Sequence, residues 1–414
     1  MDEIDTKQDF IQGEEITMIH KAISDITAGK LIDSEFSVEF NNLMNKLSSD
    51  DLFQYVKVLN GDEISILIGK CSNFDYIPLT AKILSCISSN FNEVSDIILK
   101  LDFLQFFNYC ASVISQLDAG TLERIMLILG NLYLNSEYFR NILSNSAIMN
   151  LFMTFQTDDY VLKETFYWMI SVVCGFPNGN AQELISIAWQ ISQDPIDEFS
   201  KIGFESLYSV SKWSSLVRVD YENDPSKREM LLNNLTSDDQ EMRNNCAFLL
   251  GNVIDSVDQN ILNSIIECIK IDQSDAASKC YEILGRNLNQ EMLKILKENG
   301  VFEVVTESSF SVQRSFVVFL AKASKDLRIS FIFDENLLNL LQQFVESTSN
   351  YESFCSFIVV GKLIDENYQV DLLQEILNDG SSLQELLNEY DIPPDLVDMN
   401  CYIELLRQKI ENEE

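Results

Sequence analysis

One short pattern recurs along the chain and restricts its fold more than any other feature. The clearest copy is 242-MRNNCAFLLGN-252, in which an apolar run with helical spacing ends in Gly-Asn. The copies follow one another at intervals of about 40 residues, which is the range of armadillo and HEAT repeats. The other copies are 80-TAKILSC-86, 124-RIMLILGN-131, 165-TFYWMISV-172, 202-IGFESLYSV-210 (where the register could differ by one residue), 276-AASKCYEILGR-286, 314-RSFVVFLAK-322 and 355-CSFIVVGK-362.

A helical unit of this length cannot bury its apolar face alone, so successive units must stack and share one core. Polar bends such as 234-NLTSDDQEM-242 precede the copies, and Ser237 and Asp238 suit a helix N-cap. We therefore predict an all-α, right-handed superhelical solenoid of about eight to ten armadillo-type repeats over residues 41–410. Residues 1–40 are expected to form an acidic segment that is partly helical or flexible, and residues 411–414 an acidic tail.

A glycine near the end of several copies indicates close packing between neighbouring helices. Gly251 is one example, and it costs about 1 kcal/mol of helix propensity compared with Ala. Only a packing gain would offset that cost, so we expect the helices to approach one another closely at these glycines.

Charge and cysteine usage limit the partners and the compartment. The formal net charge of −36 repels phosphate and disfavours nucleic acid, whereas a basic peptide or protein would be attracted. The alternative is that the acidic residues only keep a long helical surface soluble. The nine Cys form no CxxC pair, which favours reduced thiols and a location in the cytoplasm and nucleus. The chain has no run of apolar residues long enough to span a membrane.

Nothing in the sequence indicates catalysis. The single His, His20, has no metal-binding constellation around it. Phosphate-binding glycine loops, nucleophile elbows and zinc spacings do not occur. We therefore predict a binding protein rather than an enzyme, with no cofactor and no metal. Trp189 and Trp213 are expected to fill cores.

The recurring stretch resembles the third helix of an armadillo repeat and, more narrowly, that of importin-α. In that family the third helices read Trp-x-x-Gly/Ser-Asn. The segment 238-DDQEMRNNCAFLLGNVID-255 is the best match, with Phe248 at the Trp place and Asn252 at the Asn place. The segment 163-KETFYWMISVVCG-175 keeps Trp168 but has Val172 at the Asn place. Weaker resemblances to the family's linkers and last partial repeat occur at 143–152, 294–305, 380–390 and 399–410.

This resemblance implies an adaptor that binds basic nuclear localisation signal peptides in a concave groove for import into the nucleus. An amide can grip a peptide backbone because it both donates and accepts hydrogen bonds, and an aromatic face attracts a cation. Other nuclear-transport factors would then be partners as well. The alternative is that Asn131 and Asn252 cap or bridge neighbouring repeats. The groove residues implied are Asn131, Trp168, Phe248, Asn252 and Asp255, the last near the family's Lys-binding Asp.

The chain also departs from the family's pattern. No copy has both Trp and Asn, and the last three Asn places hold Arg286, Lys322 and Lys362, which would repel a basic peptide. Residues 1–60 contain five Lys and no Arg, so the family's Arg-rich importin-β-binding segment is missing. We therefore expect no direct binding of importin-β in the family's mode. The alternative function is an armadillo-repeat scaffold for cytoskeletal or signalling partners, and the three cations would then suit an acidic partner.

Overall fold

The computed structural model describes residues 61–286, 288–345, 350–368 and 391–413, and the regular structure in these ranges is helical throughout. The chain divides into two compact units, one ending at Ser214 and the other beginning at Ser215. His20 and the predicted N-terminal segment, residues 1–40, lie outside the described residues.

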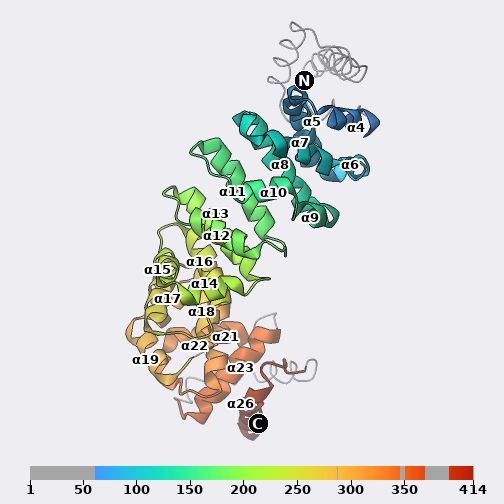
Figure 1. Cartoon of the computed structure of the whole chain (residues 1–414). Helices are drawn as coiled ribbons and strands as arrows, with labels where there is room; N and C mark the ends of the chain where they lie inside the picture. Colours follow the sequence, from blue (N-terminus) through green and yellow to red (C-terminus); the bar gives the residue numbers. More distant parts are fainter. Residues whose placement is uncertain (1–60, 287, 346–349, 369–390, 414) are drawn as a thin grey trace, which may run out of the picture. The chain divides into compact units, whose positions relative to one another are not determined.

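In the first unit, four long helices pack side by side in chain order and form the first ladder (Figure 1). These ladder helices are α5 (Ile77–Ser89), α8 (Ala119–Asn135), α11 (Tyr160–Cys174) and α13 (Asp197–Ser211). Shorter elements connect them: α4 (Gly61–Lys70), η1 (Phe74–Tyr76), α6 (Phe91–Ile98), α7 (Phe103–Val113), η2 (Ile114–Gln116), α9 (Glu137–Leu143), α10 (Ala147–Phe152) and α12 (Ala181–Ile191).

The second unit repeats this arrangement and forms the second ladder. Its ladder helices are α16 (Gln240–Val253), α18 (Asp275–Leu284), α21 (Phe310–Ser324), α23 (Asn350–Asp365) and α26 (Asn400–Glu413). Helix α26 includes residues 411–413, which we predicted as a tail. The connecting elements are α14 (Leu216–Asn223), α15 (Pro225–Asn234), α17 (Gln259–Ile271), α19 (Gln290–Glu298), α20 (Val301–Val305), η3 (Ser330–Ile332), α22 (Glu335–Val345) and η4 (Val397–Met399).

Two kinds of repeat alternate within these units. The sets α9–α10–α11, α14–α15–α16 and α19–α20–α21 each have two shorter helices before the ladder helix, as armadillo repeats do. The pairs α12–α13 and α17–α18 have one, as HEAT repeats do. Seven of the eight recurring stretches lie within ladder helices, and the copy ending at Arg286 extends two residues beyond α18. The predicted all-α repeat solenoid is confirmed.

Carboxylate caps fix where several ladder helices begin. Asp118, Asp159 and Asp239 accept hydrogen bonds from backbone N–H groups inside α8, α11 and α16, at 2.9, 3.0 and 2.8 Å. Asp239 is therefore the N-cap of α16, one residue after the predicted Asp238. Ser237 supports this cap because its hydroxyl accepts from the N–H of Asp239 at 3.2 Å.

Most of the cysteines and one of the two tryptophans expected in cores are buried. Eight of the nine cysteines are buried without forming a disulfide, and Cys401 is exposed. Trp189 is buried as predicted. Trp213 is only half-buried, and its indole donates to the carbonyl oxygen of Cys174 at 2.8 Å, so it joins two repeats. Within the described residues, no single helix has the length and apolarity to cross a membrane, although α6 and the segment Phe103–Gln116 pass that test together as a pair bent by 93°.

The ladder glycines differ in what they accommodate. A Cβ at Gly361 would lie 2.2 Å from the carbonyl oxygen of Tyr402, so α23 and α26 approach here at backbone distance, as predicted. A Cβ at Gly130 would instead meet the ring of Trp168 at 2.3 Å, and one at Gly251 would meet the side chain of Lys279 at 2.6 Å. In each case the contact comes from the next ladder helix along the chain.

Candidate functional site

Four of the predicted groove residues, Asn131, Trp168, Phe248 and Asn252, lie on a row of side chains that the ladder helices leave outside the core, and Asp255 lies two residues beyond the end of α16. We call this row the stripe. Two of the recurring copies end at core residues, because Cys86 of α5 and Val210 of α13 are buried, the second in the copy whose register was open by one residue. The exposed positions lie three residues later in α5 and one residue earlier in α13. The first stripe consists of Ser85, Ser89, Leu127, Asn131, Trp168, Val172, Glu205 and Ser209, and the second of Phe248, Asn252, Glu282, Arg286, Val318, Lys322 and Lys362.

Asn131 contacts the neighbouring repeat. Its amide nitrogen lies 3.5 Å from the hydroxyl oxygen of Ser88 and 3.4 Å from that of Ser89, both on α5. The side chain is half-buried between the two helices. This geometry agrees with the alternative in which the asparagine bridges repeats.

Trp168 is held partly exposed on the first stripe. Its ring lies directly over Gly130 of α8, where no larger residue would leave room for it. Leu127 on α8 and Val172 on α11 are also half-buried. Together Leu127, Trp168 and Val172 form an apolar group, the Trp168 patch, between two adjacent ladder helices.

Two cations stand beside the Trp168 patch. Arg124 precedes Leu127 by one helical turn, and Lys82 occupies the corresponding turn of α5. Burial, and next the nearby Arg124 guanidinium, lower the pKa of Lys82 to about 8. Among the described residues neither side chain forms an ion pair, and Arg124 only donates to the carbonyl oxygen of Gly120 at 3.3 Å. This end of the stripe therefore repels a basic peptide.

The predicted cation-binding residues of the second unit already contact cations of the chain itself. The ammonium nitrogen of Lys279 lies 5.5 Å from the centre of the Phe248 ring. Arg218 of α14 forms a two-point ion pair with Asp255, in which Nη1 lies 2.6 Å from Oδ1. Asn252 is exposed beside them. A basic peptide bound here would have to displace these internal cations.

The three cations at the last Asn places have different surroundings. Arg286 donates to the carbonyl oxygen of Gly251 at 2.5 Å and pairs with Glu282 at 2.7 Å, so it joins α18 to α16. Lys362 donates to the hydroxyl of Tyr402 at 3.2 Å and lies 3.4 Å from Glu366. Lys322 is exposed, and its ammonium has no hydrogen bond or ion pair within the described part of the chain.

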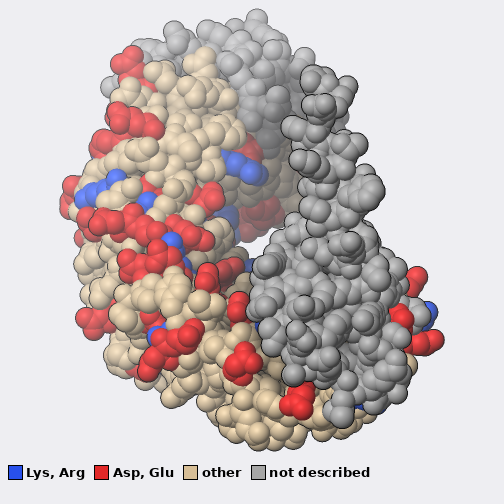
Figure 2. Space-filling view, turned by 90° about the horizontal axis from the view of Figure 1, so that it is seen from above, with Lys and Arg blue, Asp and Glu red and all other residues tan. Residues whose placement is uncertain are grey.

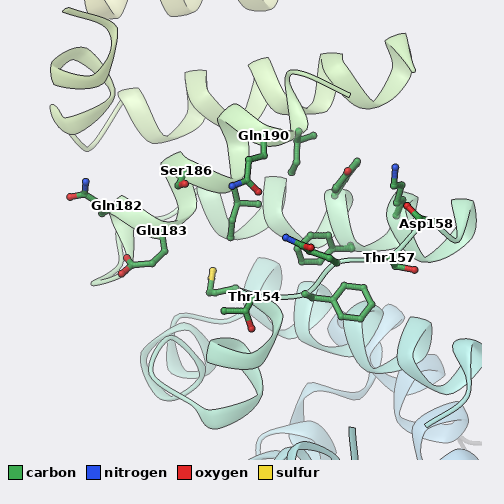
Figure 3. Close-up of a pocket in the computed structure, with 15 residues that line it drawn as sticks. Thr154, Thr157, Asp158, Gln182, Glu183, Ser186 and Gln190 are labelled. Carbon is green, nitrogen blue, oxygen red and sulfur yellow. The ribbon is translucent and has the colours of Figure 1, made fainter. Parts of the chain in front are cut away.

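One cavity of the described residues lies away from the stripe, where the segment 153–158 passes beside α11 and α12. It has a volume of about 620 Å³. Thr154 and Thr157 line it from the segment, and Gln182, Ser186 and Gln190 line it from α12 (Figure 3). Its lining is amide- and hydroxyl-rich. Beside it, Asp194 accepts from Lys163 at 3.3 Å and from the Tyr167 hydroxyl at 3.1 Å.

Acidic side chains dominate the charged surface. Figure 2 shows them in clusters, separated by broad uncharged areas and by fewer Lys and Arg. Despite this acidity, no group of three or more His, Cys, Asp or Glu in the described ranges could hold a metal ion.

The sequence offered bridging of repeats as an alternative for Asn131 and Asn252 but did not identify the partners of the predicted groove residues, although a usable signal was present. Arg218 and Asp255 are 37 residues apart, and Asn131 and Ser88 are 43 apart. Both separations are close to one repeat. A search for complementary side chains at that spacing could have indicated that the stripe residues pair with neighbouring repeats.

Comparisons with known proteins bear on the fold. No protein-family model matches the chain, and no curated protein does. The crystal structure of an engineered protein aligns with a TM-score of 0.69 at 14% sequence identity, covering 97% of this chain and 98% of that one. Computationally designed armadillo repeat proteins for modular peptide recognition align with a TM-score of 0.41 at 11% identity, over 52% of this chain and 98% of that one. The likeness to the engineered protein is one of fold alone. The helix order and the stripes give the chain an armadillo-like repeat fold.

Proposed function

We propose that this protein is a non-enzymatic scaffold that binds extended segments of partner proteins along its stripes, with the Trp168 patch as the main anchor of the first unit. One observation carries this proposal. Gly130 leaves the space in which the Trp168 ring lies half-exposed, flanked by Leu127 and Val172. A buried tryptophan would serve only the core, whereas this ring presents part of its surface outside it.

The physics of interfaces supports this role. Tryptophan is enriched among the few residues that carry most of the binding energy, because it buries a large rigid surface at little entropic cost. The glycine beneath it gives up about 1 kcal/mol of helix propensity relative to alanine. Such a cost is typical where a side chain must be held in a particular place.

The import-adaptor function rests on the resemblance to importin-α and is the less favoured proposal. A basic peptide would meet Lys82 and Arg124 beside the first stripe and would compete with Lys279 and Arg218 for the predicted cation-binding residues of the second unit. A direct test is titration with a Lys/Arg-rich localisation peptide. Salt-dependent binding that is lost in Asn252→Ala with Asp255→Ala would favour the adaptor over the general scaffold.

The scaffold proposal can be tested with a phage-displayed library of random dodecapeptides selected on the full chain. We expect enriched peptides whose affinity falls about thirtyfold or more in Trp168→Ala and less in Trp168→Phe. Tyr138→Ala is the matched control, because Tyr138 is an aromatic residue 56% exposed on α9, outside the stripe. Circular dichroism would confirm that each variant is folded. Failure to enrich any peptide, or equal losses in Trp168→Ala and Tyr138→Ala, would refute the proposal.

A further inference from the structure

A second, smaller cavity opens on the second stripe between α18 and α21. Its volume is about 240 Å³, below the roughly 300–1,000 Å³ of pockets for drug-sized ligands, so it suits a single side chain. Tyr281 and Phe319, both buried, form its floor with ring centroids 5.6 Å apart. The hydroxyl oxygens of Ser278 and Ser315 lie 2.5 Å apart in its wall.

Positive charge surrounds this cavity. Lys322 lines it with an ammonium that has no carboxylate partner among the described residues. Arg314 also lines it, is 56% exposed, and uses Nε to pair with the buried Glu352. Glu282, the one acid of the lining, is already paired with Lys279 and Arg286 at 2.7 Å each.

These charges do not balance locally. Among the charged groups that line the cavity or pair with its lining, the four cations Lys279, Arg286, Arg314 and Lys322 exceed the two carboxylates of Glu282 and Glu352 by two charges. The whole chain carries a formal net charge of −36. A positive site in so acidic a protein favours an anion locally, because the acidic residues that dominate the rest of the charged surface repel one.

The chain itself places acidic residues from just before and within η4 against this part of the ladder. Residues 391–396 precede η4 without regular structure and contain two prolines. The Asp395 carboxylate that follows these prolines accepts from the hydroxyl of Tyr351 on α23 at 2.6 Å. Asp398 pairs with Lys325, the residue after α21, at 2.6 Å, three residues beyond Lys322, while Leu396 between the two acids is fully buried. Carboxylates flanking an apolar anchor therefore already bind α23 and the C-terminal end of α21.

We propose that the cavity between α18 and α21 binds a carboxylate of an extended partner segment, either an Asp or Glu side chain or a C-terminal carboxylate. The carboxylate pairs with Lys322, the serine hydroxyls donate to it, and an adjacent apolar side chain of the partner covers Val318. This inference rests on the proposed scaffold function and adds the chemistry of the partner. The partner segment is acidic, in contrast to the basic peptide that the resemblance implies.

The dodecapeptides selected on the full chain test this inference. We expect them to include a class with a required Asp, Glu or C-terminal carboxylate, replacement of which by Asn, Gln or a C-terminal amide weakens binding about tenfold or more. In Lys322→Gln the same replacement should have no further effect, because the two groups act as one pair. Lys294→Gln on α19 is the matched control, since Lys294 is 55% exposed outside the stripe, and it should leave the loss unchanged.

The outcomes separate this inference from the scaffold proposal. Peptides that depend on Trp168 but contain only basic or neutral residues would refute the carboxylate site and leave the scaffold function standing. A peptide acid whose contribution is the same in Lys322→Gln as in the parent would also refute the site. Selection that yields no peptide at all would refute both.

Discussion

Two ladder glycines should respond in opposite ways to the same substitution. Gly251→Ala and Gly361→Ala each add one methyl group to a ladder helix of the second unit. At Gly361 the new Cβ would lie 2.2 Å from the backbone carbonyl oxygen of Tyr402, which belongs to another helix and cannot rotate away. At Gly251 it would lie 2.6 Å from Cε of Lys279, near the end of a flexible side chain.

The magnitudes follow from these contacts. To restore ordinary van der Waals contact in Gly361→Ala, α26 must move away by about 1 Å. We expect this displacement to cost a free energy near the upper end of the roughly 1–3 kcal/mol that overpacked substitutions cost. Complete detachment of α26 would expose Ile403 and Leu406, both now buried, at about 1.5–3 kcal/mol each. The replacement of glycine by alanine within α23 offsets about 1 kcal/mol of this cost through higher helix propensity. We therefore expect Gly361→Ala to lower the free energy of unfolding by about 2 kcal/mol or more.

Gly251→Ala gains the same propensity and loses little. Lys279 would swing away from the Phe248 ring and from its surface ion pair with Glu282, contacts worth up to about 1 kcal/mol each. The expected change lies within about 1 kcal/mol of zero. Urea denaturation followed by helical circular dichroism measures both variants, and both sites lie in one unit. Equal destabilisation of the two variants would refute the argument that the contacted atom decides the outcome.

Three further predictions follow. Arg243→Met should lower the free energy of unfolding by about 3–5 kcal/mol, because it leaves the buried Asp272 without its ion-pair partner. Arg218→Met should lower it by at most about 1 kcal/mol, since the ion pair of Arg218 with Asp255 is exposed. Similar losses for the two variants in thermal or urea denaturation would contradict this prediction. Burial, and then Arg124, lower the pKa of Lys82 from 10.5 to about 8, so the unfolded chain binds that proton more tightly and stability should rise with pH between about 8 and 10.5. Lys82→Met should remove this rise and raise the melting temperature at pH 7, and a parallel pH profile for the variant would contradict the assignment. A thiol reagent should modify one cysteine of the native protein, Cys401, and all nine cysteines after denaturation. Rapid modification of a second cysteine in the native protein would show that the buried thiols are more accessible than the fold implies.

The sequence predicted the ladder helices well because large apolar residues with helical spacing recur at intervals of about 40 residues. The strong copies, such as the one around Cys246 and Gly251, lie where they were placed. The register failed in α5 and α13, where small residues such as Ser88 and Ser206 are buried and blur the boundary between core and surface. A pattern based on apolar residues cannot detect a buried serine that satisfies its hydroxyl on its own helix, as Ser206 does with the carbonyl oxygen of Ile202.

The stripe was harder to predict because the surroundings of several of its residues are set by a residue one repeat away. The carboxylate of Asp255 can bind a cation, as the sequence predicts, but only the placement of α14 shows that Arg218 of the same chain is that cation. The same holds for Phe248 and Lys279. The roles given to Asn131, Trp168, Phe248, Asn252 and Asp255 in peptide binding therefore remain predictions, and binding experiments must decide them.

Photo-crosslinking of a selected dodecapeptide tests the central claim, that partner segments bind along the stripe, most directly. The peptide would carry a benzophenone side chain next to its required apolar residue, and mass spectrometry would locate the crosslinked residues on the full chain. We predict crosslinks to α8 and α11 at Leu127, Trp168 or Val172, lost in Trp168→Ala. Crosslinks that fall mainly on α9, α10 or α12, and that persist in Trp168→Ala, would contradict the account.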